Sequence, residues 1–158
     1  MKINLARASR FSVALAVLVM GASSAFASKP VKLSIGSGTA KDKEANAFTQ
    51  TTLTAKAGSP IELTFKNNAT AAGMQHNFVV VKPGKEQAVA TASMTPPNGG
   101  ADKGWLAVTP DVVANTKLLN PGESQTITFT INEPGNYPFI CTFPGHYMTM
   151  KGILKVTK

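Results

Sequence analysis

Polar and apolar positions alternate along most of this chain in short runs that are separated by turn residues. Alternation with a period of two, in runs rich in β-branched and aromatic residues, is typical of β-strands with one buried face. Seven strands are predicted, at residues 31–35, 51–55, 61–66, 77–82, 126–131, 137–142 and 153–157. Turn clusters such as Gly58-Ser59-Pro60 and Asn120-Pro121-Gly122 lie between them. This pattern predicts an all-β fold, a Greek-key β-sandwich rather than an open sheet.

One insertion breaks this rhythm. Residues 85–94 are predicted to form a short helix, and a loop through Pro96-Pro97-Asn98-Gly99-Gly100 follows. We call residues 85–100 the flap. Because the flap lies between two predicted strands, we expect it to cover one end of the sandwich.

The first 27 residues have the features of an export signal. The positive n-region contains Lys2, Arg7 and Arg10, residues 11–20 are apolar, and residues 21–27 end in an A-x-A pattern. The apolar run is short for a membrane span. We therefore expect a cleaved signal peptide over residues 1–27, one domain over residues 28–158, and a periplasmic location. An uncleaved membrane tether is the alternative.

The charge and the basic residues of the chain limit the kinds of partner that it is expected to bind. The chain carries 16 Lys and Arg against 8 Asp and Glu, a formal charge of +8. Removing the three n-region cations and no acids leaves +5, and every remaining cation is a lysine. Without arginine forks or a lysine stripe interleaved with aromatics, nucleic-acid binding is disfavoured. A mildly positive surface still favours encounter with an acidic protein.

Cys141 is the only cysteine of the chain, so no intramolecular disulfide can form. A domain of this length can bury a sufficient core without one. A lone cysteine in an exported protein indicates intermolecular pairing, a reactive thiol or a metal thiolate.

The segment from Cys141 to Gly152 reads Cys-Thr-Phe-Pro-Gly-His-Tyr-Met-Thr-Met-Lys-Gly and contains three metal donors. They are the Cys141 thiolate, the His146 imidazole and the Met150 thioether, and a second imidazole, His76, begins another predicted strand. Two His and one Cys with a weak axial Met form the donor set of electron-transfer copper sites. This set suits both Cu(II), which accepts imidazoles, and Cu(I), which prefers soft sulfur.

Each of these residues also has an ordinary interpretation. A free cysteine is often a buried small side chain, a histidine often ends a strand, and a methionine more often belongs to the core. The mature chain has one Cys and two His, however, and all three fall in the copper pattern. A zinc finger needs four such ligands, and no histidine remains for a second copper. A Cys-His hydrolase pairing Cys141 with His146 or His76 would leave the thioether spacing unexplained.

The copper segment resembles that of azurin and auracyanin, the bacterial blue-copper proteins of the cupredoxin type. Residues 74–80, Met-Gln-His-Asn-Phe-Val-Val, resemble the segment of their first ligand, and residues 116–123, Thr-Lys-Leu-Leu-Asn-Pro-Gly-Glu, a later turn. The similarity runs from about Phe48 to the C-terminus. Directly before the first histidine, azurin has glycine, whereas this chain has Gln75, as auracyanin has glutamine. The spacing from His146 to Met150, in contrast, matches azurin.

The resemblance implies one type 1 copper per chain, with His76, Cys141 and His146 as strong ligands and Met150 as the axial one. The backbone amides of Asn77 and Phe143 would hydrogen-bond to the sulfur, and the carbonyl of Gln75 would be a weak axial contact. His146 would be the ligand nearest solvent. A docking patch would surround it, formed by Met74, Pro144 and Met148.

The expected function is one-electron transport, without enzymatic activity or a small-molecule substrate. The partners would be a redox donor and acceptor, for example a c-type cytochrome, a reductase or an oxidase, and the carrier would be a monomer. Copper storage or delivery is the alternative, although the methionine count of the mature chain is unremarkable. A structural sandwich with a vestigial site is a third hypothesis.

Overall fold

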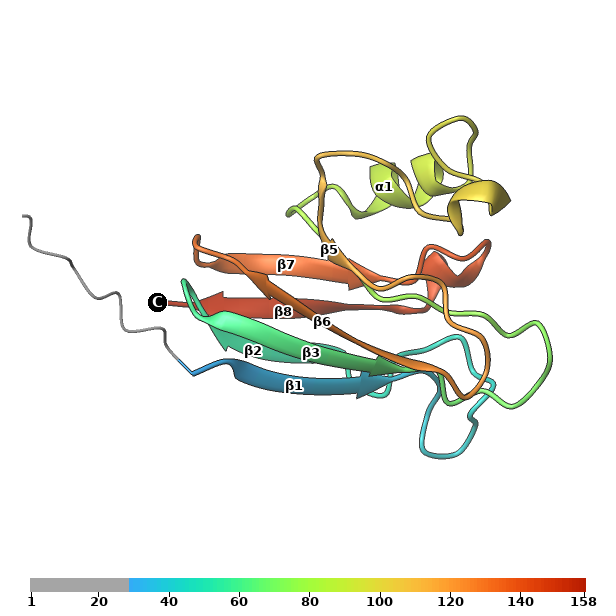
Figure 1. Cartoon of the computed structure of the whole chain (residues 1–158), viewed down its shortest axis with the longest axis horizontal. Helices are drawn as coiled ribbons and strands as arrows, with labels where there is room; N and C mark the ends of the chain where they lie inside the picture. Colours follow the sequence, from blue (N-terminus) through green and yellow to red (C-terminus); the bar gives the residue numbers. More distant parts are fainter. Residues whose placement is uncertain (1–28) are drawn as a thin grey trace, which may run out of the picture.

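The computed structural model describes residues 29–158, so the predicted signal peptide lies outside the described residues. Two β-sheets pack face to face, and one helix lies outside them (Figure 1). The elements are β1 Val31–Gly36, β2 Thr52–Lys56, β3 Pro60–Lys66, β4 Val79–Val81, α1 Glu86–Ser93, η1 Ala101–Lys103, β5 Val112–Asn115, β6 Ser124–Thr130, β7 Gly135–Ile140, η2 His146–Met148 and β8 Lys151–Thr157. The predicted β-sandwich with a short helical flap is confirmed.

The smaller sheet has the strand order β1-β3-β6, with β1 parallel and β6 antiparallel to β3. The central strand shows why alternation predicted it: Ile61, Leu63 and Phe65 are fully buried, and the residues between them are partly exposed. Side chains that alternate across a strand place one row in the core and the other in solvent.

The larger sheet has the order β2-β8-β7-β4-β5, with β2 parallel to β8 and the other pairs antiparallel. All three residues of β4 are buried, because one face of this strand meets the core and the other meets α1. The strand β5 was not predicted. Its four residues are all half-buried and therefore carry no alternation.

Four phenylalanine rings fill the space between the sheets near the metal end. Phe48, Phe65, Phe78 and Phe139 contact one another with centroid separations of 4.9–6.2 Å. The side chains of Cys141 and Met150 belong to the same buried cluster. The candidate ligands are therefore part of the packed core and are held by it.

The flap lies in a different place from the one we expected. Val89 and Ala90 of α1 pack on Val79, Val81 and Ile140, on the outer face of the larger sheet rather than over one end of the sandwich. The reason is that β4 and β7 present an apolar outer face, which the buried side of the helix covers. The return segment, residues 101–111, links the flap to β5 and reaches the metal end, where the ring of Trp105 meets that of Phe143.

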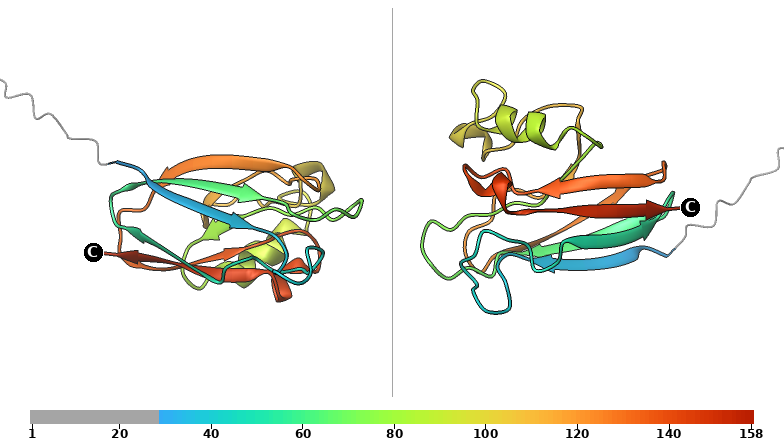
Figure 2. Two further views of the ribbon diagram at one scale, coloured as in Figure 1. Left: turned by 90° about the horizontal axis from the view of Figure 1, so that it is seen from below. Right: turned by 180° about the vertical axis from the view of Figure 1, so that it is seen from behind.

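The loops that carry the candidate ligands gather at the end of the sandwich opposite the C-terminus (Figures 1 and 2). They are the loop between β3 and β4 and the loop between β7 and β8. Strand ends from both sheets thus converge on one region. No helix in residues 29–158 is long and apolar enough to cross a membrane.

Candidate metal centre

Three donor atoms meet at this end of the sandwich. The Cys141 Sγ atom lies 3.9 Å from His76 Nδ1 and 3.8 Å from His146 Nδ1, and the two Nδ1 atoms are 3.1 Å apart. His76 and Cys141 are fully buried, whereas His146 is 7% exposed. His146 is thus the least buried of the three donors.

The loop between β7 and β8 is closed by its own backbone. The Cys141 amide donates to the Met150 carbonyl at 3.0 Å, and the Met150 amide donates to the His146 carbonyl at 2.8 Å. Gly145 takes φ 81°, a left-handed conformation that glycine adopts readily, immediately before His146. These contacts turn the segment back on itself, so that residues five and nine positions after the cysteine lie beside it.

Close packing requires glycine at position 152, just after this loop. A Cβ atom there would lie 2.3 Å from Cζ of Phe139 and 2.7 Å from the carbonyl of Thr51. Only glycine allows the chain to pass this close to the core after Met150. The Met-Lys-Gly motif therefore fixes the point at which β8 joins the core.

His76 is held from the other side of the site. Its backbone exchanges two hydrogen bonds with Leu119, at 3.1 and 2.8 Å. The buried Asn67 side chain donates to the carbonyls of Met74 and Leu119, at 2.7 and 3.0 Å, and accepts from Ser37 Oγ at 2.9 Å. Asn67 thus ties together the segments that position His76. No sequence pattern indicates this role, because Asn67 stands in an ordinary turn cluster.

Backbone amides surround the sulfur of Cys141. Those of Asn77 and Phe143 hydrogen-bond to it. The Asn77 side chain also pairs with Thr142, accepting from its amide and donating to its hydroxyl, each at 2.8 Å. The two ligand loops are therefore cross-linked next to the thiol, and such contacts orient a metal ligand.

The protonation states favour a metal over protons at the two imidazoles. Burial, followed by the nearby His146, lowers the pKa of His76 from 6.5 to about 4, although Glu44 opposes this shift. Burial also lowers the pKa of His146. Burial raises the pKa of Cys141 to about 11, against the effect of its two amide donors. Both imidazoles are therefore neutral near pH 7, and metal binding must displace the thiol proton.

The donor set fits copper. Donors that share one ion with bonds of about 2.0–2.3 Å are separated by roughly 3–4 Å, as these three are. The two buried imidazole nitrogens face each other at 3.1 Å, a separation at which they share a proton or bind one metal ion. A Cys and two His with a thioether nearby favour copper over zinc, which prefers a closed set of four N or S ligands.

The two methionines of this loop lie in different environments. Met150 is fully buried in the core cluster, whereas the side chain of Met148 is 70% exposed. Met74 and Pro144, expected in the docking patch, are half-buried. The axial role of Met150, the weak contact of the Gln75 carbonyl and the docking role of the patch stay predictions.

The family follows from the fold and the donors together. Residues 31–157 match the model of the copper binding proteins of the plastocyanin/azurin family, and the chain belongs to this family. The predicted resemblance and the copper cofactor are thus confirmed. Within residues 29–158, the donor atoms of His76, Cys141 and His146 lie close enough together to hold one metal ion.

Among known proteins, the chain is similar to auracyanins and azurins. It is 44% identical to auracyanin-B of Chloroflexus aurantiacus, over 72% of this chain and 48% of that protein. It is 39% identical to auracyanin-A of the same organism, over 82% and 76%. The structure matches reduced auracyanin from Roseiflexus castenholzii with a TM-score of 0.68 and 38% identity, over 80% and 97%. This chain thus spans about half of auracyanin-B and most of auracyanin-A.

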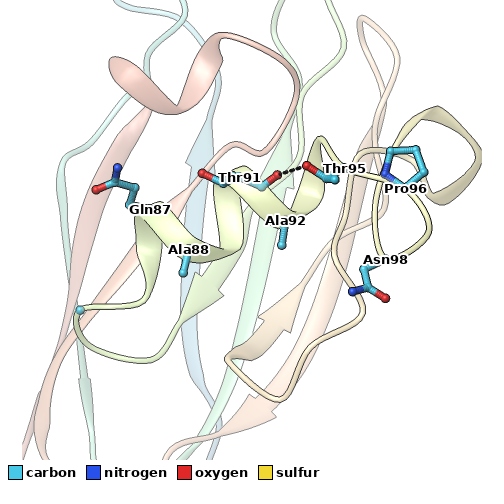
Figure 3. Close-up of a pocket in the computed structure, with 8 residues that line it drawn as sticks. Gln87, Ala88, Thr91, Ala92, Thr95, Pro96 and Asn98 are labelled. Carbon is cyan, nitrogen blue, oxygen red and sulfur yellow. Dashed lines mark hydrogen bonds between the residues drawn. The ribbon is translucent and has the colours of Figure 1, made fainter.

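A separate hollow of about 670 Å³ lies on the flap, between α1 and the loop after it (Figure 3). Its lining is small and uncharged: Gly84, Gln87, Ala88, Thr91, Ala92, Thr95, Pro96 and Asn98. None of these residues is a candidate ligand or an acid–base group. The hollow therefore adds no catalytic chemistry to the metal centre.

In the metal-free protein, we expect the free energy of unfolding to fall as the pH decreases from 6.5 to about 4. The pKa of His76 is lowered in the folded state, so the unfolded chain takes up this proton first, and acid favours unfolding. Above pH 6.5 both states are neutral and this stability is fully present. Thermal unfolding of chelator-treated protein measures it. The melting temperature of His76→Gln should depend less on pH in this window, and equal slopes would contradict the assignment.

Proposed function

We propose that this protein carries single electrons between other redox proteins, using one type 1 copper. The observation that carries the proposal is the buried group of His76, Cys141 and His146, whose donor atoms already lie within 4.8 Å of one another. Copper would supply the change between Cu(II) and Cu(I). A ligand set held by a packed core needs little rearrangement between these states, which favours rapid electron transfer.

Each ligand would have a separate role. His76 and Cys141 would anchor the metal inside the core, and Met150 would be a weak axial donor. His146, the least buried of the three strong ligands, would pass the electron. The residues around its ring, Met74, Pro144 and Met148, would form a small apolar contact with the partner.

The partners would be a redox donor and acceptor, for example a c-type cytochrome, a reductase or an oxidase, and the carrier would act as a monomer without catalysing a reaction itself. The features of residues 1–27 support export to the periplasm. A mature charge of +5 favours encounter with an acidic protein surface.

Storage or delivery of copper is the second hypothesis, and the burial of the donors argues against it. A delivery protein needs an accessible and exchangeable site. Here the three strong donors are at most 7% exposed, and the exposed methionine of this loop, Met148, is not accompanied by a cluster of others. A carrier requires such closure, because it must keep its metal through each cycle.

Electron self-exchange of the copper-loaded protein tests this function. NMR line broadening in mixtures of the oxidised and reduced forms should show rapid exchange, with copper retained in the presence of a chelator. Met74→Glu should slow the exchange by about tenfold while leaving the visible spectrum intact, because a charge must be desolvated at the apolar contact. Met94→Glu is the matched control, since Met94 is 46% exposed at the end of α1.

Three results would contradict this model. Slow exchange in the unmodified protein would contradict the carrier function, and loss of copper to the chelator on reduction would favour delivery. If Met74→Glu and Met94→Glu behaved alike, electrons would leave by another route than the edge of His146.

A further inference from the structure

Trp105 is the only tryptophan of the chain and lies in the return segment, where this segment approaches the metal end. Its φ is 55°, and no other non-glycine residue in the described part of the chain has a positive φ. A left-handed backbone costs roughly 1–2 kcal/mol for a residue with a Cβ atom. Such a conformation persists only where the surroundings hold it.

A hydrogen bond from the metal loop holds the backbone of Trp105. The hydroxyl of Thr142 donates to the Trp105 carbonyl, and Thr142 follows Cys141 directly. The same hydroxyl accepts from the side chain of Asn77 at 2.8 Å. The backbone of Trp105 is therefore joined to the cross-link between the two ligand loops, next to the amides that bind the sulfur.

The ring of Trp105 reaches the same site by a second route. It meets the ring of Phe143 edge to face, with centroids 6.2 Å apart and an interplanar angle of 74°. The Phe143 ring lies against the ring of His146 at 4.8 Å. Three aromatic rings thus run in sequence from the return segment to a metal ligand, in geometries that are favourable for aromatic pairs.

We propose that Trp105 is a positioning residue, which holds Thr142 and Phe143 of the metal loop in place and so closes the thiol of Cys141 on the side of the return segment. Its ring keeps Phe143 over His146 and thereby keeps the Phe143 amide on the sulfur. Its carbonyl anchors Thr142. The effect on electron transfer rests on the proposed function, whereas the closure of the thiol does not require a metal.

The closure is measured on the metal-free protein by labelling Cys141 with a small alkylating reagent. Cys141 is fully buried, so it reacts only when the structure opens locally. Trp105→Ala should accelerate labelling by about tenfold, which corresponds to a change of about 1.4 kcal/mol in the opening equilibrium. Trp105→Phe, which keeps an aromatic ring, should restore most of the protection.

The copper-loaded protein supplies the second measurement. In Trp105→Ala the reduction potential should fall, because water that reaches the loop stabilises the more highly charged Cu(II). The visible absorption should shift as the amide contact to the sulfur loosens. Leu106→Ala is the matched control: Leu106 is the next residue and packs with the flap on the outer face of the larger sheet, so it should change neither quantity.

The proposal is overturned if folded Trp105→Ala labels at the rate of the unmodified protein, or if Leu106→Ala accelerates labelling equally. If Trp105→Ala does not fold, Trp105→Leu, which keeps an apolar side chain without the ring, is judged by the same two measurements. Failure of the proposed function would look different. An unmodified protein without a blue copper spectrum would contradict the carrier, and the labelling rates would still decide the role of Trp105.

Discussion

Adding Cu(II) to the purified protein should produce an intense visible colour with one copper bound per chain, and Cys141→Ser should abolish that colour. The intensity would come from charge transfer between the Cys141 thiolate and the metal. A serine hydroxyl has no comparable transition. The donors are already grouped and buried, so the colour should develop without extensive refolding. Absorption spectroscopy during a copper titration measures both the intensity and the stoichiometry.

The control for this experiment is a change that leaves the donors intact. Met94→Leu, on the flap, should give the spectrum of the unmodified protein. Colour that survives Cys141→Ser, or a colourless complex of the unmodified protein, would contradict the type 1 site and support the vestigial alternative.

Met150→Leu should keep the colour but raise the reduction potential, whereas Met148→Leu should change the potential little. Met150 is fully buried beside Cys141, and Met148 is 70% exposed. Loss of a sulfur donor destabilises Cu(II) more than Cu(I). The potential rises by about 59 mV for each tenfold loss in relative affinity for Cu(II). Redox titration followed by the visible absorption measures both variants.

Each variant is the control for the other, because both replace a methionine of the same loop by leucine. A larger shift in Met148→Leu than in Met150→Leu would show that the axial donor is assigned to the wrong residue. Equal and negligible shifts would indicate a site without a thioether ligand.

The metal centre could be predicted from the sequence because its chemistry depends on rare residues at short spacing. Cys141, His146 and Met150 lie within one loop, and such a loop closes on itself through local backbone bonds such as that between Cys141 and Met150. The second imidazole could be assigned because the mature chain contains only one other histidine, His76. The assignment of His76 therefore depends on the small number of histidines and not on any predicted position.

Most strands were also predictable, for a reason that is local to each strand. In β3, alternate residues face the core, and the alternation is visible in the sequence. The alternation is missing at β5, whose residues are all half-buried, and β4 is shorter than the predicted strand 77–82, since it covers only Val79–Val81. Burial on both faces or on neither removes the periodic signal on which the prediction depends.

The tertiary structure alone decided what surrounds the metal. The outer face of β4 and β7 is created by strand pairing, so only the folded molecule shows that the flap covers it rather than one end. Asn67 and Trp105 act on residues far away in the chain, through contacts with Leu119 and Thr142. The sequence by itself determined which residues are the candidate ligands, because donor chemistry belongs to single residues. How firmly those atoms are held was decided by long-range packing, which no local pattern records.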